Sequence, residues 1–272
     1  MDWSLFAPWI PAYLLLGCIG GFAGGLLGIG GGMIYVPLLT WLFELQGFPG
    51  SSLLHLALGT SLTTIIFSSV SSANAHHQRG NVDWSIVRGL APGVIIGGLL
   101  GGWIAKRLDT TALAVIFALF VTYSAVQMFL NAKPKPSRLV PGPGGLAIVG
   151  TLISTLSQLV GAGGGFATVP FLTWCNVSMH RAVGTSAALG LPIAIVGAIA
   201  FFINGRGVAD LPAGSLGFIY LPALIALVVP SVLFAPLGAR LASRLPVATL
   251  KRVFAAFLFV LALKMVHSAL LH

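Results

Sequence analysis

Apolar stretches follow one another along almost the whole chain, with only short polar breaks between them. They cover residues 10–27, 33–46, 53–73, 84–105, 113–131, 146–160, 166–176, 181–203, 214–241 and 247–271. Several reach the roughly 20 residues that a helix needs to cross a bilayer, whereas 33–46 and 166–176 are too short to cross easily alone. Because lipid offers no hydrogen-bond partners, such segments must satisfy their backbone groups internally. The sequence therefore predicts an all-α polytopic membrane protein, embedded in the lipid bilayer.

The charged residues support a membrane location and argue against a nucleic-acid partner. Only 7% of the residues are charged, against about a quarter in soluble globular domains. The net charge of +9 comes from Lys and Arg residues that are scattered at the ends of the apolar segments. A nucleic-acid-binding protein would gather them on one face, whereas the cytoplasmic loops of membrane proteins are enriched in them. We therefore expect no nucleic-acid partner.

Three matched blocks divide the chain into two related halves. The pattern G-x-G-G-G-x4-P-x-L occurs at 28–39 and again at 161–172. Gly-Thr-Ser follows at 59–61 and at 184–186, and Ala-x-Arg-Leu at 105–108 and at 242–245. The shared order predicts an internal duplication, with a first membrane repeat at 1–132, a polar linker at 133–145 and a second membrane repeat at 146–272.

Two topologies fit this duplication. If each glycine run breaks a single spanning helix, the halves are parallel and the 14 Lys and Arg divide evenly between the two sides of the membrane. If each run is the tip of a re-entrant hairpin followed by three spanning helices, the halves are inverted and the same residues divide ten against four. Because cytoplasmic loops carry the excess of positive charge, the second arrangement is favoured. It predicts both termini outside the cytoplasm.

The glycine runs are the first candidates for a binding site. Consecutive glycines disfavour a helix, and a break is tolerated in a membrane where it is buried in protein or lines a wet cavity. The helix that restarts there has unpartnered N–H groups at the positive end of its dipole, which suit a small anion. The alternative is close helix packing, our interpretation of the glycines at 20–25 and 97–102. The candidate donors are Gly30, Gly31, Gly32, Gly163, Gly164 and Gly165.

Polar side chains near the breaks extend the list of substrate-binding candidates. Hydroxyls could donate to an oxyanion, or they could bond to carbonyl groups of their own helix. Gln158 lies in an apolar run just before the second break, which suits a side chain facing a cavity. Arg181 starts an apolar segment, where it could face a cavity or extend to the membrane interface. The hydroxyl candidates are Thr60, Ser61, Thr185 and Ser186.

Histidines are the candidates for a proton relay. His55 and His180 occupy equivalent positions in the two halves, and an imidazole can bind an anion or carry a proton. Both also begin apolar segments, so an interfacial position is the alternative. We expect His76 and His77 to lie in a solvated polar loop.

The acidic residues and cysteines exclude several classes of function. The chain has only five Asp and Glu, and none is central in an expected span. A cationic substrate would find nothing to neutralise it, so we expect a small anionic substrate. Cys18 and Cys175 have no C-x-x-C spacing, and no histidines pair clearly across spans as haem ligands would. The sequence therefore predicts no metal site, no cofactor and no enzymatic activity.

At these motifs the sequence resembles the TauE/SafE sulfite exporter family. The resemblance is carried by residues 24–39, by 161–172 and by the two Gly-Thr-Ser blocks. It implies a multi-pass transporter in a bacterial- or archaeal-type plasma (inner) membrane. The substrates it implies are sulfur-containing anions such as sulfite, sulfonates or sulfoacetate. The individual anion and the direction of transport do not carry over.

Together, these observations predict a secondary transporter of a small sulfur-containing oxyanion, working by alternating access around the paired glycine breaks. An anion channel and a permease for another small organic anion are the alternatives. A homodimer is among the assemblies that the sequence allows.

Overall fold

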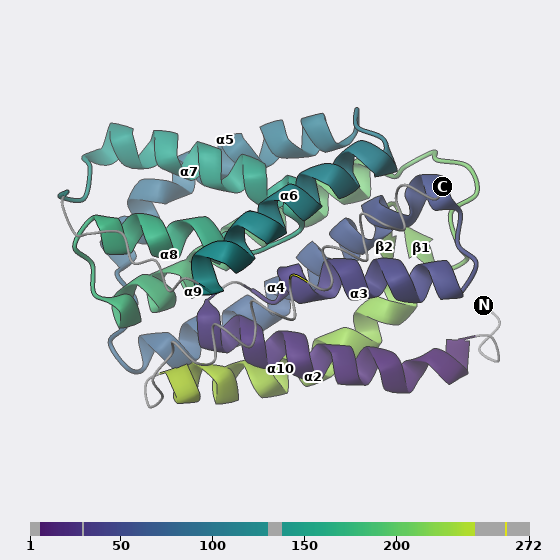
Figure 1. Cartoon of the computed structure of the whole chain (residues 1–272), viewed down its shortest axis with the longest axis horizontal. Coiled ribbons are helices and arrows are strands. Elements are labelled where there is room, and N and C mark those ends of the chain that lie inside the picture. The colour runs from purple at the N-terminus through teal and green to yellow at the C-terminus, as the bar shows by residue number, and fades with distance from the viewer. Residues whose placement is uncertain (1–5, 29, 130–137, 243–258, 260–272) are drawn as a thin grey trace.

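The computed structural model describes residues 6–28, 30–129, 138–242 and 259, and these are almost entirely helical (Figure 1). Short 3-10 turns at Ala7–Trp9 and Gly50–Ser52 precede two of the helices, and an antiparallel ribbon of β1 (Ser215–Leu216) and β2 (Ile219–Tyr220) precedes the last. The α-helices are α2 (Ile10–Leu27), α3 (Gly32–Leu45), α4 (Leu53–His77), α5 (Trp84–Ala105), α6 (Thr110–Phe129), α7 (Pro143–Val160), α8 (Gly165–Trp174), α9 (Met179–Asn204) and α10 (Leu221–Ala242).

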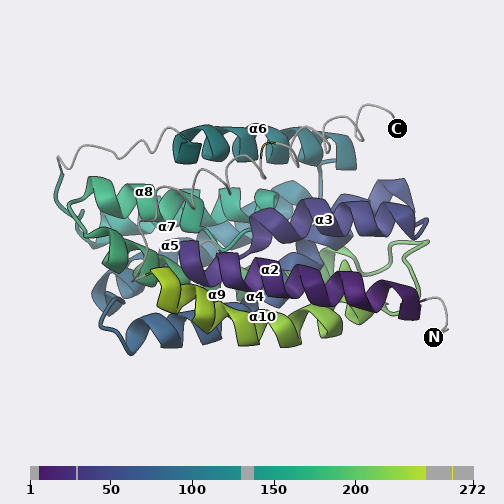
Figure 2. The same ribbon diagram turned by 60° about the horizontal axis from the view of Figure 1, so that its bottom comes forward.

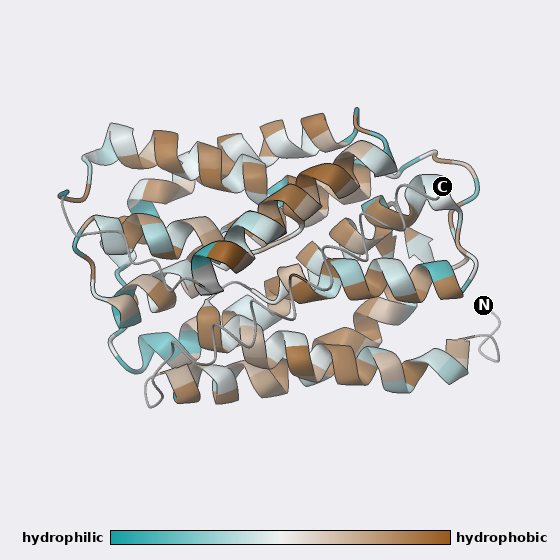
Figure 3. Ribbon diagram, viewed as in Figure 1, coloured by the Kyte–Doolittle hydropathy of each residue, from teal (hydrophilic) through white to brown (hydrophobic). Residues whose placement is uncertain are grey.

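Seven of the described helices are long and apolar enough to cross a bilayer: α2, α4, α5, α6, α7, α9 and α10. Helices α3 and α8 are shorter, as the sequence predicts. Large apolar side chains cover the outside of the bundle, with Leu119 68%, Ile148 66% and Ile225 65% exposed, as lipid contact permits. Hydrophobic residues extend along the helices, whereas many hydrophilic ones gather in the loops at both ends (Figure 3). The predicted class of all-α polytopic membrane protein is confirmed.

Each glycine break is the turn of a helical hairpin. Helices α2 and α3 run in opposite directions, and so do α7 and α8 (Figure 1). Helix α2 starts at the end of the bundle where the N-terminus is marked, whereas α7 starts at the opposite end. The two hairpins thus enter from opposite ends, as inverted repeats require. The relation between complete halves stays a prediction, because the expected segment 247–271 lies almost wholly outside the described residues.

The long helices of the two halves pair with each other. Helix α5 packs along α7, and α10 packs along α2. A Cβ atom on Gly97 would lie 2.1 Å from the carbonyl oxygen of Thr151, and one on Gly21 would lie 2.5 Å from that of Ser231. Glycine is therefore needed at these two positions for the close approach, as the packing interpretation predicts. The halves interlock, and the repeat boundaries at 132/133 and 145/146 stay predictions.

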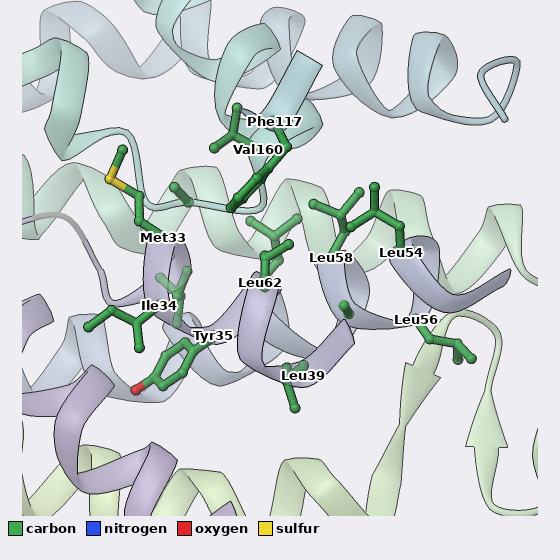
Figure 4. Packing of buried hydrophobic residues seen from close by; sticks show 14 of the residues in the cluster. Met33, Ile34, Tyr35, Leu39, Leu54, Leu56, Leu58, Leu62, Phe117 and Val160 are labelled. Atoms are coloured by element: carbon green, nitrogen blue, oxygen red, sulfur yellow. The ribbon is translucent and has the colours of Figure 1, made fainter. Parts of the chain in front are cut away.

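Helices α4 and α9 pack against each other at the centre of the bundle, and each also packs against the second helix of a hairpin, α3 or α8. Buried apolar side chains of α3, α4, α6 and α7 form one cluster, which includes Ile34, Leu58, Phe117 and Val160 (Figure 4). Helix α6 lies on the outer side of the bundle (Figure 2). This arrangement holds the turns of both hairpins in the protein interior.

Candidate functional site

Backbone conformation explains why both breaks are built from glycine. Gly28 and Gly31 have φ values of 69° and 79°, and their counterparts Gly161 and Gly164 have values of 62° and 77°. A side chain is strained in this left-handed region, so glycine is the residue that fits. Gly28 and Gly161 end the first helix of each hairpin, and Gly31 and Gly164 cap the start of the second.

The two breaks touch each other inside the bundle. A Cβ atom on Gly30 would lie 3.2 Å from the Cα atom of Gly163, and one on Gly32 would lie 2.0 Å from the carbonyl oxygen of Gly161. Any side chain at Gly32 would therefore push the breaks apart. The structure brings glycines from both candidate sets into contact, although the sets lie more than a hundred residues apart in the sequence.

The second helix of each hairpin starts with N–H groups outside its hydrogen-bond ladder. In α3, the N–H groups of Ile34 and Tyr35 both donate to the Gly31 carbonyl, at 2.9 and 3.0 Å. The corresponding N–H groups of α8 donate to the Gly164 carbonyl in the same way. The residues before them precede the first intrahelical bond and carry the positive end of the helix dipole. Both breaks therefore have the polarity that favours an anion.

Serine hydroxyls tie each break to the opposite half. Ser61 of α4 donates to the carbonyl of Gly161, and Ser186 of α9 donates to the carbonyl of Gly28, both at 2.9 Å. All four residues are buried. The hydroxyl hydrogens of these two candidates are thus engaged by the protein in this structure, so binding of a substrate by them would require the bonds to rearrange.

The Gly-Thr pairs that precede these serines hold two loops against the helices. The hydroxyl of Thr60 accepts the N–H of Tyr220 at 3.0 Å, and that of Thr185 accepts the N–H of Asp83 at 2.9 Å. Gly59 lies against the loop before α10, and Gly184 lies against the loop before α5. Each Gly-Thr-Ser motif therefore fixes a loop with its first two residues and a glycine break with its third.

Gln158 lies one turn before the second break, on α7. Its side chain is fully buried, and its Nε2 donates to the carbonyl of Ile193 at 3.1 Å. The Oε1 atom has no hydrogen-bond partner among the described residues. The neighbouring residue on α9 is Gly197, where a Cβ atom would lie 2.2 Å from Oε1. Gln158 is thus an unsatisfied acceptor in the interior.

Arg181 lies at one end of the bundle, not beside the breaks. Its guanidinium is half exposed and forms an ion pair of 2.7 Å with Asp83, the N-cap of α5. A hydrogen bond from the Ser85 side chain holds the pKa of the Asp83 carboxyl below its usual value, so this carboxylate stays ionised at neutral pH.

The histidines at equivalent positions have different surroundings. His55 is buried at the start of α4, where its Nε2 lies 3.1 Å from the carbonyl oxygen of Ala105 and its ring stacks on Phe218. His180 is exposed at the start of α9, at the opposite end of the bundle. The structure does not bring these two relay candidates together.

The expectation of a solvated loop at His76 is wrong. Helix α4 continues to His77, and the His76 side chain is only 2% exposed. Its Nε2 lies 3.0 Å from the carbonyl oxygen of Gly25, so this nitrogen carries a hydrogen and donates. The hydrogen bond to α2 explains the burial. His77 is exposed, with its Nδ1 accepting from Trp84.

A small pocket beside the first break was missed by sequence reasoning. Its lining includes Gly28 and Gly30 together with three serines of α4, Ser68, Ser69 and Ser72. All three serines are at least 96% buried. The signal available in the sequence is the run of serines at 68–72 inside an apolar segment, since hydroxyls at that depth need partners.

The interior is rich in uncharged groups that can bind an anion. Among the residues that the structure describes, the buried polar side chains are hydroxyls, Gln158 and the two histidines His55 and His76. Within the described ranges, no three His, Cys, Asp or Glu side chains gather as a metal site would require. Hydroxyls and helix N-termini can bind an anion reversibly without supplying a charge.

Comparisons with known proteins agree with this picture. The sequence profile described as Sulfite exporter TauE/SafE matches residues 13–265. A probable membrane transporter protein of Haemophilus influenzae is 41% identical, over 93% of this chain and 96% of the relative. A probable membrane transporter protein of Methanocaldococcus jannaschii is 25% identical, over 94% of this chain and 95% of the relative. No solved structure matches the chain.

The profile covers nearly the whole chain, including both glycine breaks and both Gly-Thr-Ser motifs. The relatives are named as transporters and not as enzymes. The protein is therefore a membrane transporter, and the chain belongs to the TauE/SafE sulfite exporter family.

Proposed function

We propose that this transporter is a secondary carrier of a small sulfur-containing oxyanion, of the sulfite, sulfonate or sulfoacetate type. It works by alternating access and resides in the plasma (inner) membrane. The observation that carries the proposal is the contact between the two glycine breaks, which come from hairpins entering the bundle at opposite ends. Paired helix breaks of this kind commonly form the substrate sites of secondary transporters.

An anion suits this site better than a cation. Among the described residues, the carboxylates of Glu44, Asp83, Asp109 and Asp210 all lie in loops or at helix ends. The breaks present helix N-termini and are surrounded by hydroxyls, which stabilise negative charge. The family to which the chain belongs is described by sulfite export, which indicates the sulfur oxyanions as the first substrates to test.

The contact between the breaks also suggests how access alternates. Ser61 and Ser186 join each break to a helix of the other half. A substrate bound between the breaks would compete with these bonds and with the backbone contact. Its binding would loosen one hairpin from the centre while the other hairpin stays in place, which exposes the site to one side at a time.

Counterflow of radiolabelled sulfite in proteoliposomes tests the proposal. We expect saturable uptake that is accelerated by unlabelled sulfite inside the vesicles and inhibited by small sulfonates. A carrier shows such acceleration, whereas an anion channel gives single-channel currents without it. Absence of saturable flux and of any thermal stabilisation by sulfite or sulfonates would contradict the proposed substrate class.

The variant Gly30→Ala tests whether the breaks form the site. The added Cβ atom would lie between the breaks, 3.1 Å from the Cγ2 atom of Ile65 and 3.2 Å from the Cα atom of Gly163. We expect sulfite counterflow to fall by about tenfold or more in protein that elutes as a single species in detergent. The matched control is Gly144→Ala on α7, where nothing lies within 4 Å of the added Cβ. Equal loss in both variants would mean that the effect is not specific to the breaks.

A further inference from the structure

We infer that Ser68, Ser69 and Ser72 form the oxyanion-binding pocket of this transporter, which we call the serine pocket. The inference rests on the proposed function and assigns its substrate contacts to side chains of α4. These serines are not among the residues that the sequence motifs single out.

The position of the serine pocket links it to both breaks. Its lining includes Gly28 and Gly30 of the first break together with Ala187 and Gly190 of α9. A Cβ atom on Gly190 would lie 3.6 Å from the carbonyl oxygen of Gly163, in the second break. An ion in this pocket would therefore lie beside the elements that the proposed mechanism moves.

Two hydroxyls of the serine pocket, those of Ser68 and Ser72, have a long hydrogen bond or none among the described residues. The Oγ of Ser72 is buried and has no partner in the described part of the chain. The Oγ of Ser68 lies 3.4 Å from the carbonyl oxygen of Ile65, a long hydrogen bond. By contrast, Thr64 on the same helix donates to the carbonyl of Thr60 at 2.8 Å. Buried hydroxyls without acceptors are disfavoured, and an oxyanion would supply those acceptors.

The second half shows that packing alone does not require these hydroxyls. When the two Gly-Thr-Ser motifs are aligned, the three serines correspond to Ile193, Ala194 and Gly197 of α9. All three of these residues are buried, and their helix is similar in length to α4. The serines are thus specific to the first half, although the helices occupy equivalent places in the two repeats.

The chemistry of the pocket fits a small oxyanion. Sulfite has three oxygen atoms on one centre, and the three serines can each donate one hydrogen bond without a charged side chain. Neutral donors hold an anion reversibly, as a carrier requires for release. The pocket is small in this structure, so α4 and α9 must separate for an ion to enter, and alternating access provides such a movement.

The double variant Ser69→Ala with Ser72→Ala tests the inference directly. Removing two hydrogen bonds to a charged ligand should raise the KM for sulfite counterflow about tenfold or more. The thermal stabilisation by sulfite should decrease in parallel. The matched control is Ser71→Ala on the same helix, whose hydroxyl donates to the carbonyl of Val232 on α10; it should keep the wild-type KM.

A steric variant gives a second test that does not remove a hydroxyl. A Cβ atom on Gly190 would lie 2.6 Å from the Ser69 Oγ, so Gly190→Ala narrows the pocket. We expect sulfite counterflow to be lost in this variant while its elution profile in detergent is unchanged. Wild-type KM in both the double-serine variant and Gly190→Ala would overturn the serine pocket and leave the proposed carrier intact. Absence of sulfite flux and binding in the wild-type protein would overturn both.

Discussion

At the scale of single residues, two hydroxyl groups join the halves of the molecule. Ser61 and Ser186 each donate to a carbonyl in the opposite glycine break. The sequence predicts that these serines matter, because they recur in a matched motif. It does not predict their acceptors, which lie 100 and 158 residues away. His76 shows the same limit, since it lies in a polar cluster that is typical of a loop, yet its side chain is buried and bonds to the carbonyl of Gly25.

Removing either bond should destabilise the protein. Ser61→Ala or Ser186→Ala leaves a buried carbonyl without its donor, which costs about 1–3 kcal/mol. We expect both variants to unfold at lower temperature than the wild type in detergent, by similar amounts. The control is Ser51→Ala, where the residue is exposed. If both variants had the same melting temperature as the wild type and the control, the two serine hydrogen bonds would contribute nothing to stability.

At the scale of elements, length and hydropathy predict the spanning helices well. The expected segment 84–105 coincides with α5, and 10–27 coincides with α2. The start of α10 is predicted less well, because the expected segment 214–241 includes the ribbon at 215–220. That ribbon is held on α4 by the bond from the Tyr220 N–H to Thr60. A tertiary contact of this kind overrides an apolar pattern that suits a helix.

The close packing of α5 on α7 through glycine gives a prediction at the same scale. In Gly97→Leu, the Cβ atom alone would lie 2.1 Å from the carbonyl oxygen of Thr151, so the leucine side chain would clash with α7. Overpacking should lower the free energy of unfolding by about 1–3 kcal/mol, seen as a lower melting temperature in detergent. Gly144→Leu serves as the control, since its Cβ position is open. Equal melting temperatures for the two variants would contradict the close packing of α5 on α7.

At the scale of the whole molecule, the ends of the bundle differ in charge. Five described arginines lie at the end where α4 and α10 finish: Arg79, Arg88, Arg138, Arg181 and Arg240. Lys106, Arg107 and Arg206 lie at the other end. Positively charged loops favour the cytoplasm, so the arginine-rich end should face inward. The sequence suggests this orientation from its repeat and its charges. It does not predict that α5 pairs with α7 and α10 with α2, because many apolar helices offer similar faces.

Labelling of single cysteines tests the orientation. In a background of Cys18→Ser and Cys175→Ser, we expect Val208→Cys to react with a membrane-impermeant maleimide in intact cells. Gln78→Cys should react only after permeabilisation, since it lies at the opposite end of the bundle. Both positions are exposed in the structure. The reverse pattern would place the arginine-rich end outside and contradict the predicted topology.

Because the two halves interlock, we expect neither half to fold stably by itself. A polypeptide severed between α6 and α7 would yield one fragment with α5 lacking α7, and another with α10 lacking α2. In each fragment, a carbonyl group of the glycine break would also lack its hydrogen-bond donor, because the serine that donates to it belongs to the other fragment. Activity should return only when both fragments are synthesised in the same cell and meet in the membrane.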